Sequence, residues 1–180
     1  PRLAMADTYF AMGAAPEAEA TYAALVDDED AGPQALVGLG RLALDGGRGA
    51  AAARHFEAAL ERDPGNVAAM NGRAVALDLM GRHAEAQAVY DDILARDPGN
   101  RAVLTNRGLS YALGGDSDRA VSALTPLASG AAAQPEALHN LALAHALDGD
   151  LRSAERILSA QMDPVALRET MLFYRRISRN

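Results

Sequence analysis

Apolar side chains recur along the chain at helical spacing, in two segments for every 34 residues. Within residues 67–100, Met70, Ala74 and Leu77 follow the spacing i, i+4, i+7, and a second apolar set begins at Val89. Each set places its side chains on one face of a helix. The pattern therefore predicts a pair of amphipathic helices in each stretch of 34 residues.

Glycine and alanine recur in fixed registers, 34 residues apart. The glycines are Gly13, Gly47, Gly81, Gly115 and Gly149, and alanine lies five residues after each, at Ala18, Ala52, Ala86, Ala120 and Ala154. Glycine can take the left-handed conformation that ends a helix. The tetrapeptide Asp-Pro-Gly-Asn ends the units at 63–66 and 97–100, and proline stops a helix because it lacks an N–H. Each unit is predicted to be helix, turn, helix, turn.

The predicted units share one small and one large position. The repeats are approximately 1–32, 33–66, 67–100, 101–134 and 135–163, followed by a capping helix at 164–178, in a single domain over 1–180. The small residues are Ala6, Gly40, Ala74, Gly108 and Ala142, and the large ones are Tyr22, Phe56, Tyr90, Leu124 and Leu158. We expect the helices of a unit to approach closely at the small residue, with the large one filling the space beside it.

Three irregular segments interrupt the pattern. Pro126 lies inside the expected second helix of the fourth unit and should kink or end it, leaving residues 129–134 as a loose connection. The four acids at 27–30 are expected to form a solvated turn. Leu167, Met171 and Tyr174 share one face of the last helix, which should cover the exposed end of the fifth unit.

This alternation of small, large, glycine and proline positions resembles the tetratricopeptide repeat (TPR). The resemblance implies an all-α, right-handed TPR superhelix (an α-solenoid) whose first helices line a concave groove. Carried over from the family, the groove positions fall on Asp7, Phe10, Gln34, Arg41, Leu44, Asn71, Val75, Asp78, Thr105, Asn106, Leu109, His139, Asn140 and Leu143. The candidate partner-binding residues are Asp7, Arg41, Asn71, Arg73, Asp78, Thr105, Asn106, Arg107, His139 and Asn140.

Two groups of these residues have two interpretations each. Asn106 and Asn140 share one register, and asparagine can donate to and accept from a peptide backbone, yet the same side chains could bond neighbouring repeats. Arg73 and Arg107 stand where leucine is usual in the repeat. They could meet an acidic partner, or extend along the groove edge and pair with acids of an adjacent unit.

Composition and charge narrow the function. The net charge is −7, all 17 basic residues are arginine, and residues 1–100 hold 16 acids against 8 arginines, which argues against nucleic acid or an anionic membrane as partner. The chain lacks cysteine, and no apolar run approaches the length of a transmembrane helix. His139 and His145 are six residues apart and point to different sides of a helix. We therefore expect no cofactor, no metal and no enzymatic activity.

The C-terminal third resembles a narrower family. The segments 120–128, 139–144, 147–155 and 173–176 resemble the TPR lipoproteins of the tight-adherence (Tad/Flp) pilus machinery, known as TadD. That resemblance implies a periplasmic protein associated with the outer membrane through a lipid anchor upstream of Pro1, which helps a pilus secretin to assemble or localise, in the manner of a pilotin. The alternative is a cytosolic TPR scaffold or regulatory domain of a larger protein. Self-association through Leu172, Phe173 and Ile177 also stays open.

Overall fold

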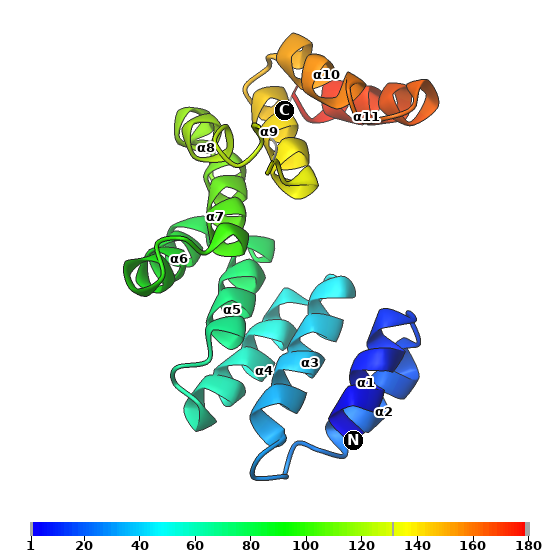
Figure 1. Cartoon of the computed structure of the whole chain (residues 1–180), viewed down its shortest axis with the longest axis vertical. Coiled ribbons are helices and arrows are strands. Elements are labelled where there is room, and N and C mark those ends of the chain that lie inside the picture. The colour runs from blue at the N-terminus through cyan, green and yellow to red at the C-terminus, as the bar shows by residue number, and fades with distance from the viewer. Residues whose placement is uncertain (1, 131, 179–180) are drawn as a thin grey trace. The chain divides into compact units, whose positions relative to one another are not determined.

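The computed structural model describes residues 2–130 and 132–178 and is all-α (Figure 1). The described residues form eleven helices: α1 (Arg2–Ala11), α2 (Ala15–Ala23), α3 (Gly32–Asp45), α4 (Gly49–Arg62), α5 (Val67–Leu79), α6 (His83–Arg96), α7 (Arg101–Leu113), α8 (Ser117–Leu124), α9 (Pro135–Leu147), α10 (Leu151–Ser159) and α11 (Pro164–Ile177). No strand occurs among them. The predicted fold class, an all-α solenoid of helix pairs, is confirmed.

Left-handed glycines join the two helices of each pair, as the register predicts. Gly13, Gly47, Gly81, Gly115 and Gly149 all have positive φ, between +67° and +85°. At the third pair, the Gly81 amide donates to the Asp78 carbonyl and the Arg82 amide donates to the Leu77 carbonyl, each at 2.9 Å. These bonds close the C-terminus of α5 and turn the chain into α6.

The repeated Asp-Pro-Gly-Asn sequence joins one pair to the next. Its asparagine is the N-cap of the following helix: the Asn66 side chain accepts from the Ala69 amide at 3.0 Å, and Asn100 accepts from Val103 at 3.2 Å. The side-chain amide of Asn66 also donates to Asp63 at 3.1 Å, which closes the turn. One short sequence therefore ends a helix and begins the next.

Large buried side chains rest on glycines of the first helices. Phe56 is fully buried on α4, and a Cβ on Gly40 of the same pair would lie 2.7 Å from its ring. Gly72, on α5 of the next pair, would meet the same ring even more closely. Leu124 makes the equivalent contact with Gly108. The predicted packing of small against large is thus confirmed, and it also extends into the following repeat.

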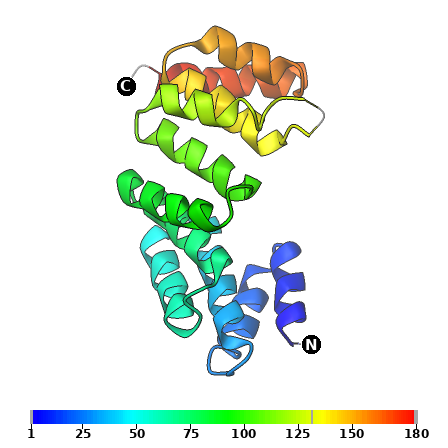
Figure 2. The same cartoon turned by 60° about the vertical axis from the view of Figure 1, so that its left-hand side comes forward.

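The chain divides into two compact units, residues 1–89 and 90–180. In the first unit, α1 to α5 pack in succession, each helix against the next, and α3 also contacts α5. In the second, α7 packs against α8 and α9, and α11 packs against both α9 and α10. Figure 2 shows these last three helices, in yellow, orange and red, side by side. A single domain over residues 1–180 stays a prediction.

The irregular C-terminal segments follow the sequence-based prediction. Helix α8 ends at Leu124, just before Pro126, and the described residues between it and α9 are not helical. Ala131, within the predicted connection 129–134, lies outside the described residues. Met171 and Tyr174 of α11 are buried with Leu158 of α10, and Leu167 packs at their edge. The last helix therefore covers the end of the fifth pair.

Candidate functional site

A hollow of about 250 Å³ lies on the first helices of the N-terminal unit. Its lining comes from α1, α3 and the start of α5, and consists of Leu3, Asp7, Gln34, Val37, Gly38, Arg41, Asn66 and Ala68. Asp7, Gln34 and Arg41 are groove residues predicted from the repeat register. The structure therefore brings together three predicted residues from two helices that are separated in sequence by α2.

Aromatic residues hold the two charged groups of this hollow in place. The Tyr22 hydroxyl donates to Asp7 Oδ1 at 2.6 Å, and the Arg41 guanidinium carbon lies 4.2 Å from the centroid of the Phe10 ring. Burial, and then the hydrogen bond to Asp7, raise the pKa of Tyr22 to about 12. Tyr22 therefore remains a neutral donor at physiological pH. The hollow presents an oriented carboxylate and a stacked cation.

Gly38 is a residue of this hollow that the sequence analysis did not select. A Cβ at Gly38 would collide with the Tyr22 ring, so only glycine lets that ring lie beneath Asp7 and Gln34. Gly72 stands in the same position one repeat later and meets Phe56 in the same way. The recurrence of glycine at 38 and 72 was the available signal.

The C-terminal unit has a comparable hollow of about 270 Å³ on α7 and the start of α9. It is lined by Ala102, Thr105, Asn106, Gln134 and Glu136. The Thr105 hydroxyl donates to the Gln134 side-chain carbonyl at 3.0 Å, which ties α7 to the N-cap of α9. Thr105 and Asn106 were both predicted to face the groove. Gln134 and Glu136 were not, because they precede and begin their helix.

The predicted residues of α5 lie outside the first hollow. Asp78 is 2.8 Å from His83 Nδ1, at the turn between α5 and α6. Asn71 and Arg73 are half-buried on α5, and the Arg73 Nε is buried without a hydrogen-bond partner among the described residues. These three residues therefore do not join Asp7 and Arg41.

Arg107 pairs with a neighbouring repeat. Its Nη1 donates to Asp91 Oδ1 of α6 at 2.6 Å, and its guanidinium lies 5.8 Å from the Tyr111 ring centroid. Of the two interpretations of this arginine, the structure supports pairing with an acid of the adjacent unit.

The α9 candidates lie apart from the second hollow. The exposed His139 donates from Nδ1 to the Pro135 carbonyl at 3.0 Å, and Asn140 is half-buried. Neither lines one of the hollows described above. Within residues 2–130 and 132–178, no group of three or more His, Asp or Glu side chains could hold a metal. No helix in that part of the chain is long and apolar enough to cross a membrane.

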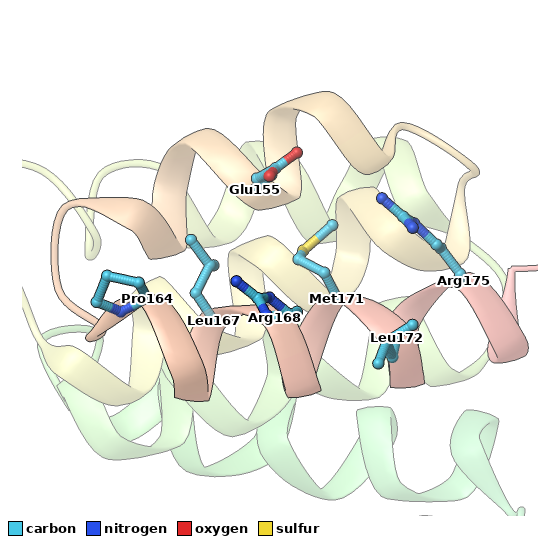
Figure 3. A pocket seen from close by; sticks show the side chains of 7 residues that line it. All are labelled: Glu155, Pro164, Leu167, Arg168, Met171, Leu172 and Arg175. Atoms are coloured by element: carbon cyan, nitrogen blue, oxygen red, sulfur yellow. The ribbon is translucent and has the colours of Figure 1, made fainter.

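A third hollow, of about 210 Å³, lies between α10 and α11 (Figure 3). It is lined by Glu155, Pro164, Leu167, Arg168, Met171, Leu172 and Arg175. The sequence analysis identified the buried face of α11 but not this surface. Arg168 and Arg175 are seven residues apart and so lie near one another on a helix, which was the available signal.

Helix pairs joined by left-handed glycines, with hollows on their first helices, define an α-solenoid of the kind that binds other proteins. Tetratricopeptide repeat family models match residues 3–66, 39–101 and 74–125, and a second such model matches 135–160. The chain belongs to the tetratricopeptide repeat family. That fold suggests a protein-interaction module. No curated protein sequence is significantly similar to the chain.

Solved TPR structures share the fold at low sequence identity. TTC0263, a thermophilic TPR protein of Thermus thermophilus, is 21% identical, with 96% of each chain covered and a TM-score of 0.78. MamA of Desulfovibrio magneticus RS-1 is 16% identical over 88% of this chain and 90% of its own, with a TM-score of 0.68. YrrB, a TPR protein with an unusual peptide-binding site, is 17% identical over 94% and 90%, with a TM-score of 0.63. These similarities establish the fold.

Proposed function

We propose that this protein binds an extended segment of a protein partner in the hollows on its first helices, without catalysing a reaction. The observation that carries the proposal is the N-terminal hollow, where Asp7, Gln34 and Arg41 converge from α1 and α3. A second hollow with polar groups, on α7 and α9, supports the same mode of binding.

The chemistry of the N-terminal hollow suits a peptide backbone with an acidic side chain. The Gln34 carboxamide can both donate to and accept from main-chain amides. Arg41 offers its guanidinium to a carboxylate or carbonyl oxygen, and its contact with Phe10 limits its conformational freedom before binding. Asp7 accepts from Tyr22 and has further acceptor capacity for a peptide N–H.

We propose further that the partner belongs to the Tad/Flp pilus machinery, as a secretin or another secretion-system component. The support is the resemblance of residues 120–128, 139–144, 147–155 and 173–176 to TadD-like lipoproteins. On this proposal the protein acts in the periplasm at the outer membrane. YrrB, which shares the fold, is described as having an unusual peptide-binding site, and this precedent supports the peptide-binding half of the proposal.

Site-specific photocrosslinking in the native cells tests the proposal. A photoreactive amino acid replaces Gln34 in the hollow, and a control chain carries it at Arg54, an exposed residue of α4 that does not line the hollow. We expect a discrete crosslinked partner from position 34 only. Adding Arg41→Ala should lower the crosslinking yield about ten-fold, since a hydrogen bond to a charged group contributes roughly 1.5–3 kcal/mol.

The outcomes separate the two levels of the proposal. Equal crosslinking from positions 34 and 54, or a yield insensitive to Arg41→Ala, would contradict binding in the hollow. A discrete crosslink to a cytosolic protein would retain the hollow as the site and eliminate the pilus assignment, in favour of a cytosolic scaffold. Mass spectrometry of the crosslinked band identifies the partner.

A further inference from the structure

The outward face of α11 is an apolar and cationic surface that the proposed peptide site does not use. Met171 and Tyr174 face α10 and are buried, whereas Val165, Leu172 and Phe173 are 66%, 55% and 53% exposed. The stripe through Val165 and Leu172 continues along the hollow between α10 and α11. Exposed apolar side chains grouped on one helix face are typical of an interaction surface.

Two arginines give this surface its charge. Arg168 and Arg175 border the hollow on α11, and Glu155 faces them from α10 (Figure 3). Within the described part of the chain, neither arginine forms an ion pair. The Leu167 and Met171 side chains lie between the two helices and form the apolar lining (Figure 3). An occupant with carboxylates would therefore complement the rim of this hollow.

The turn of residues 27–30 supplies exposed carboxylates on a fixed backbone. The Asp28 side chain accepts from the amides of Asp30 and Ala31, at 3.1 and 2.8 Å. Arg62 of α4 donates to the Val26 and Asp28 carbonyls, the latter at 2.8 Å. The turn is thus ordered by the fold before any partner binds, which reduces the entropic cost of docking.

We propose that the α10–α11 hollow docks the 27–30 turn of a second copy of this chain. Residues 1–31 hold seven acids and one arginine, whereas residues 151–180 hold six arginines and three acids. The carboxylates of Asp27, Glu29 and Asp30 form no ion pair within the described residues, so they are available to Arg168 and Arg175. The contact is head-to-tail, and such heterologous contacts can extend into open chains.

A charge-swap experiment tests this docking with the 180-residue chain. The tail variant carries Arg168→Glu and Arg175→Glu, and the head variant carries Asp27→Arg and Asp30→Arg. Sedimentation velocity is recorded over roughly a hundred-fold range of concentration, at low and high salt. We expect the wild-type chain to associate reversibly and more weakly at high salt. Each variant alone should associate about a hundred-fold more weakly, because like charges then face each other.

Mixing the two variants distinguishes specific docking from a general charge effect. Glutamates of the tail variant then face arginines of the head variant, while the remaining contact keeps its natural charges, so the mixture should recover association. Glu155→Gln should strengthen wild-type association, since it removes the carboxylate from the hollow. The double variant Arg48→Glu and Arg54→Glu, exposed on α4 and its N-cap, is the matched control and should associate as the wild type does.

Circular dichroism melting checks that each variant is folded. A wild-type chain that stays monomeric at every concentration would overturn the proposal. So would an association that survives both charge reversals, or one that mixing fails to restore. Because Gln34 and Arg41 take no part in this contact, failure here leaves the peptide-binding hollow untouched.

Discussion

Glycine sets how closely neighbouring helices approach in this chain. Phe56 and Tyr22 each lie against a glycine of the following repeat, Gly72 and Gly38, where a Cβ would collide with the ring. Overpacking of this kind typically costs about 1–3 kcal/mol, whereas alanine gains about 1 kcal/mol over glycine in helix propensity. Close packing outweighs propensity at these positions. Alanine-rich helices with few aromatic residues are joined in this way.

The Tyr22–Asp7 contact links the proposed site to stability at alkaline pH. The pKa of Tyr22 is raised from its ordinary 10 to about 12, so the folded state holds the phenol proton more tightly than the unfolded state. Its contribution is complete below pH 10 and is lost as the pH rises towards 12. A shift of this size corresponds to about 2–3 kcal/mol.

Tyr22→Phe should therefore flatten the alkaline loss of stability. We expect the variant to be less stable than the wild type at neutral pH, because Asp7 loses its donor. Urea unfolding between about pH 8 and pH 11.5 should then show a smaller decline for the variant than for the wild type. A residual decline is expected from Tyr174, whose pKa is also raised by burial. Tyr9→Phe, on the half-buried Tyr9, should keep the wild-type slope, and an unchanged slope in Tyr22→Phe would refute the argument.

Helix ends in this protein depend on side-chain caps. Asp163 is the N-cap of α11, and its Oδ1 accepts from the amides of Val165 and Ala166, at 2.9 and 3.1 Å. Pro164 follows as the first helical residue, where a missing N–H costs nothing. The helix that closes the C-terminal unit thus begins on a cap and a proline.

Asp163→Ala should lower the free energy of unfolding by about 1 kcal/mol, the usual cost of removing an N-cap acceptor. The reason is that two amide donors at the start of α11 lose their protein partner. Asp163→Asn keeps an acceptor and should stay close to the wild type. Glu169→Ala, an exposed change on the same helix, controls for the lost negative charge. Urea unfolding measures all three, and equal losses for the alanine and asparagine variants would argue against capping.

The elements were predictable wherever local chemistry determines them. Gly81 and the Asp-Pro-Gly-Asn turns encode helix ends within a few residues, and Pro126 ends α8 for a local reason. Side-chain partners were less predictable. Arg107 turns towards Asp91, an acid sixteen residues away on another helix, and the family register does not encode such a choice. The α10–α11 hollow likewise depends on how α11 packs, which periodicity alone does not specify.

Stability in a solenoid is a sum over neighbours, because each repeat contacts mainly the one before and the one after. Phe56 illustrates this, since its ring touches Gly40 of its own pair and Gly72 of the next. The residues packed around it all belong to α3, α4, α5 and the segments joining them. The C-terminal unit has its own buried residues, centred on Leu124 and Leu158. A defect in one unit should therefore be felt locally first.

Phe56→Ala tests this locality. The substitution should cost about 3–5 kcal/mol, because it leaves a cavity between the helix pairs that glycine cannot fill. Hydrogen exchange followed by mass spectrometry should show faster exchange in α3, α4 and α5, with little change in α9, α10 and α11. Leu158→Ala, which opens a cavity at the C-terminal cluster, should give the reverse pattern. If either variant instead accelerated exchange equally along the whole chain, the protein would unfold as one cooperative block, and the nearest-neighbour description would be wrong for it.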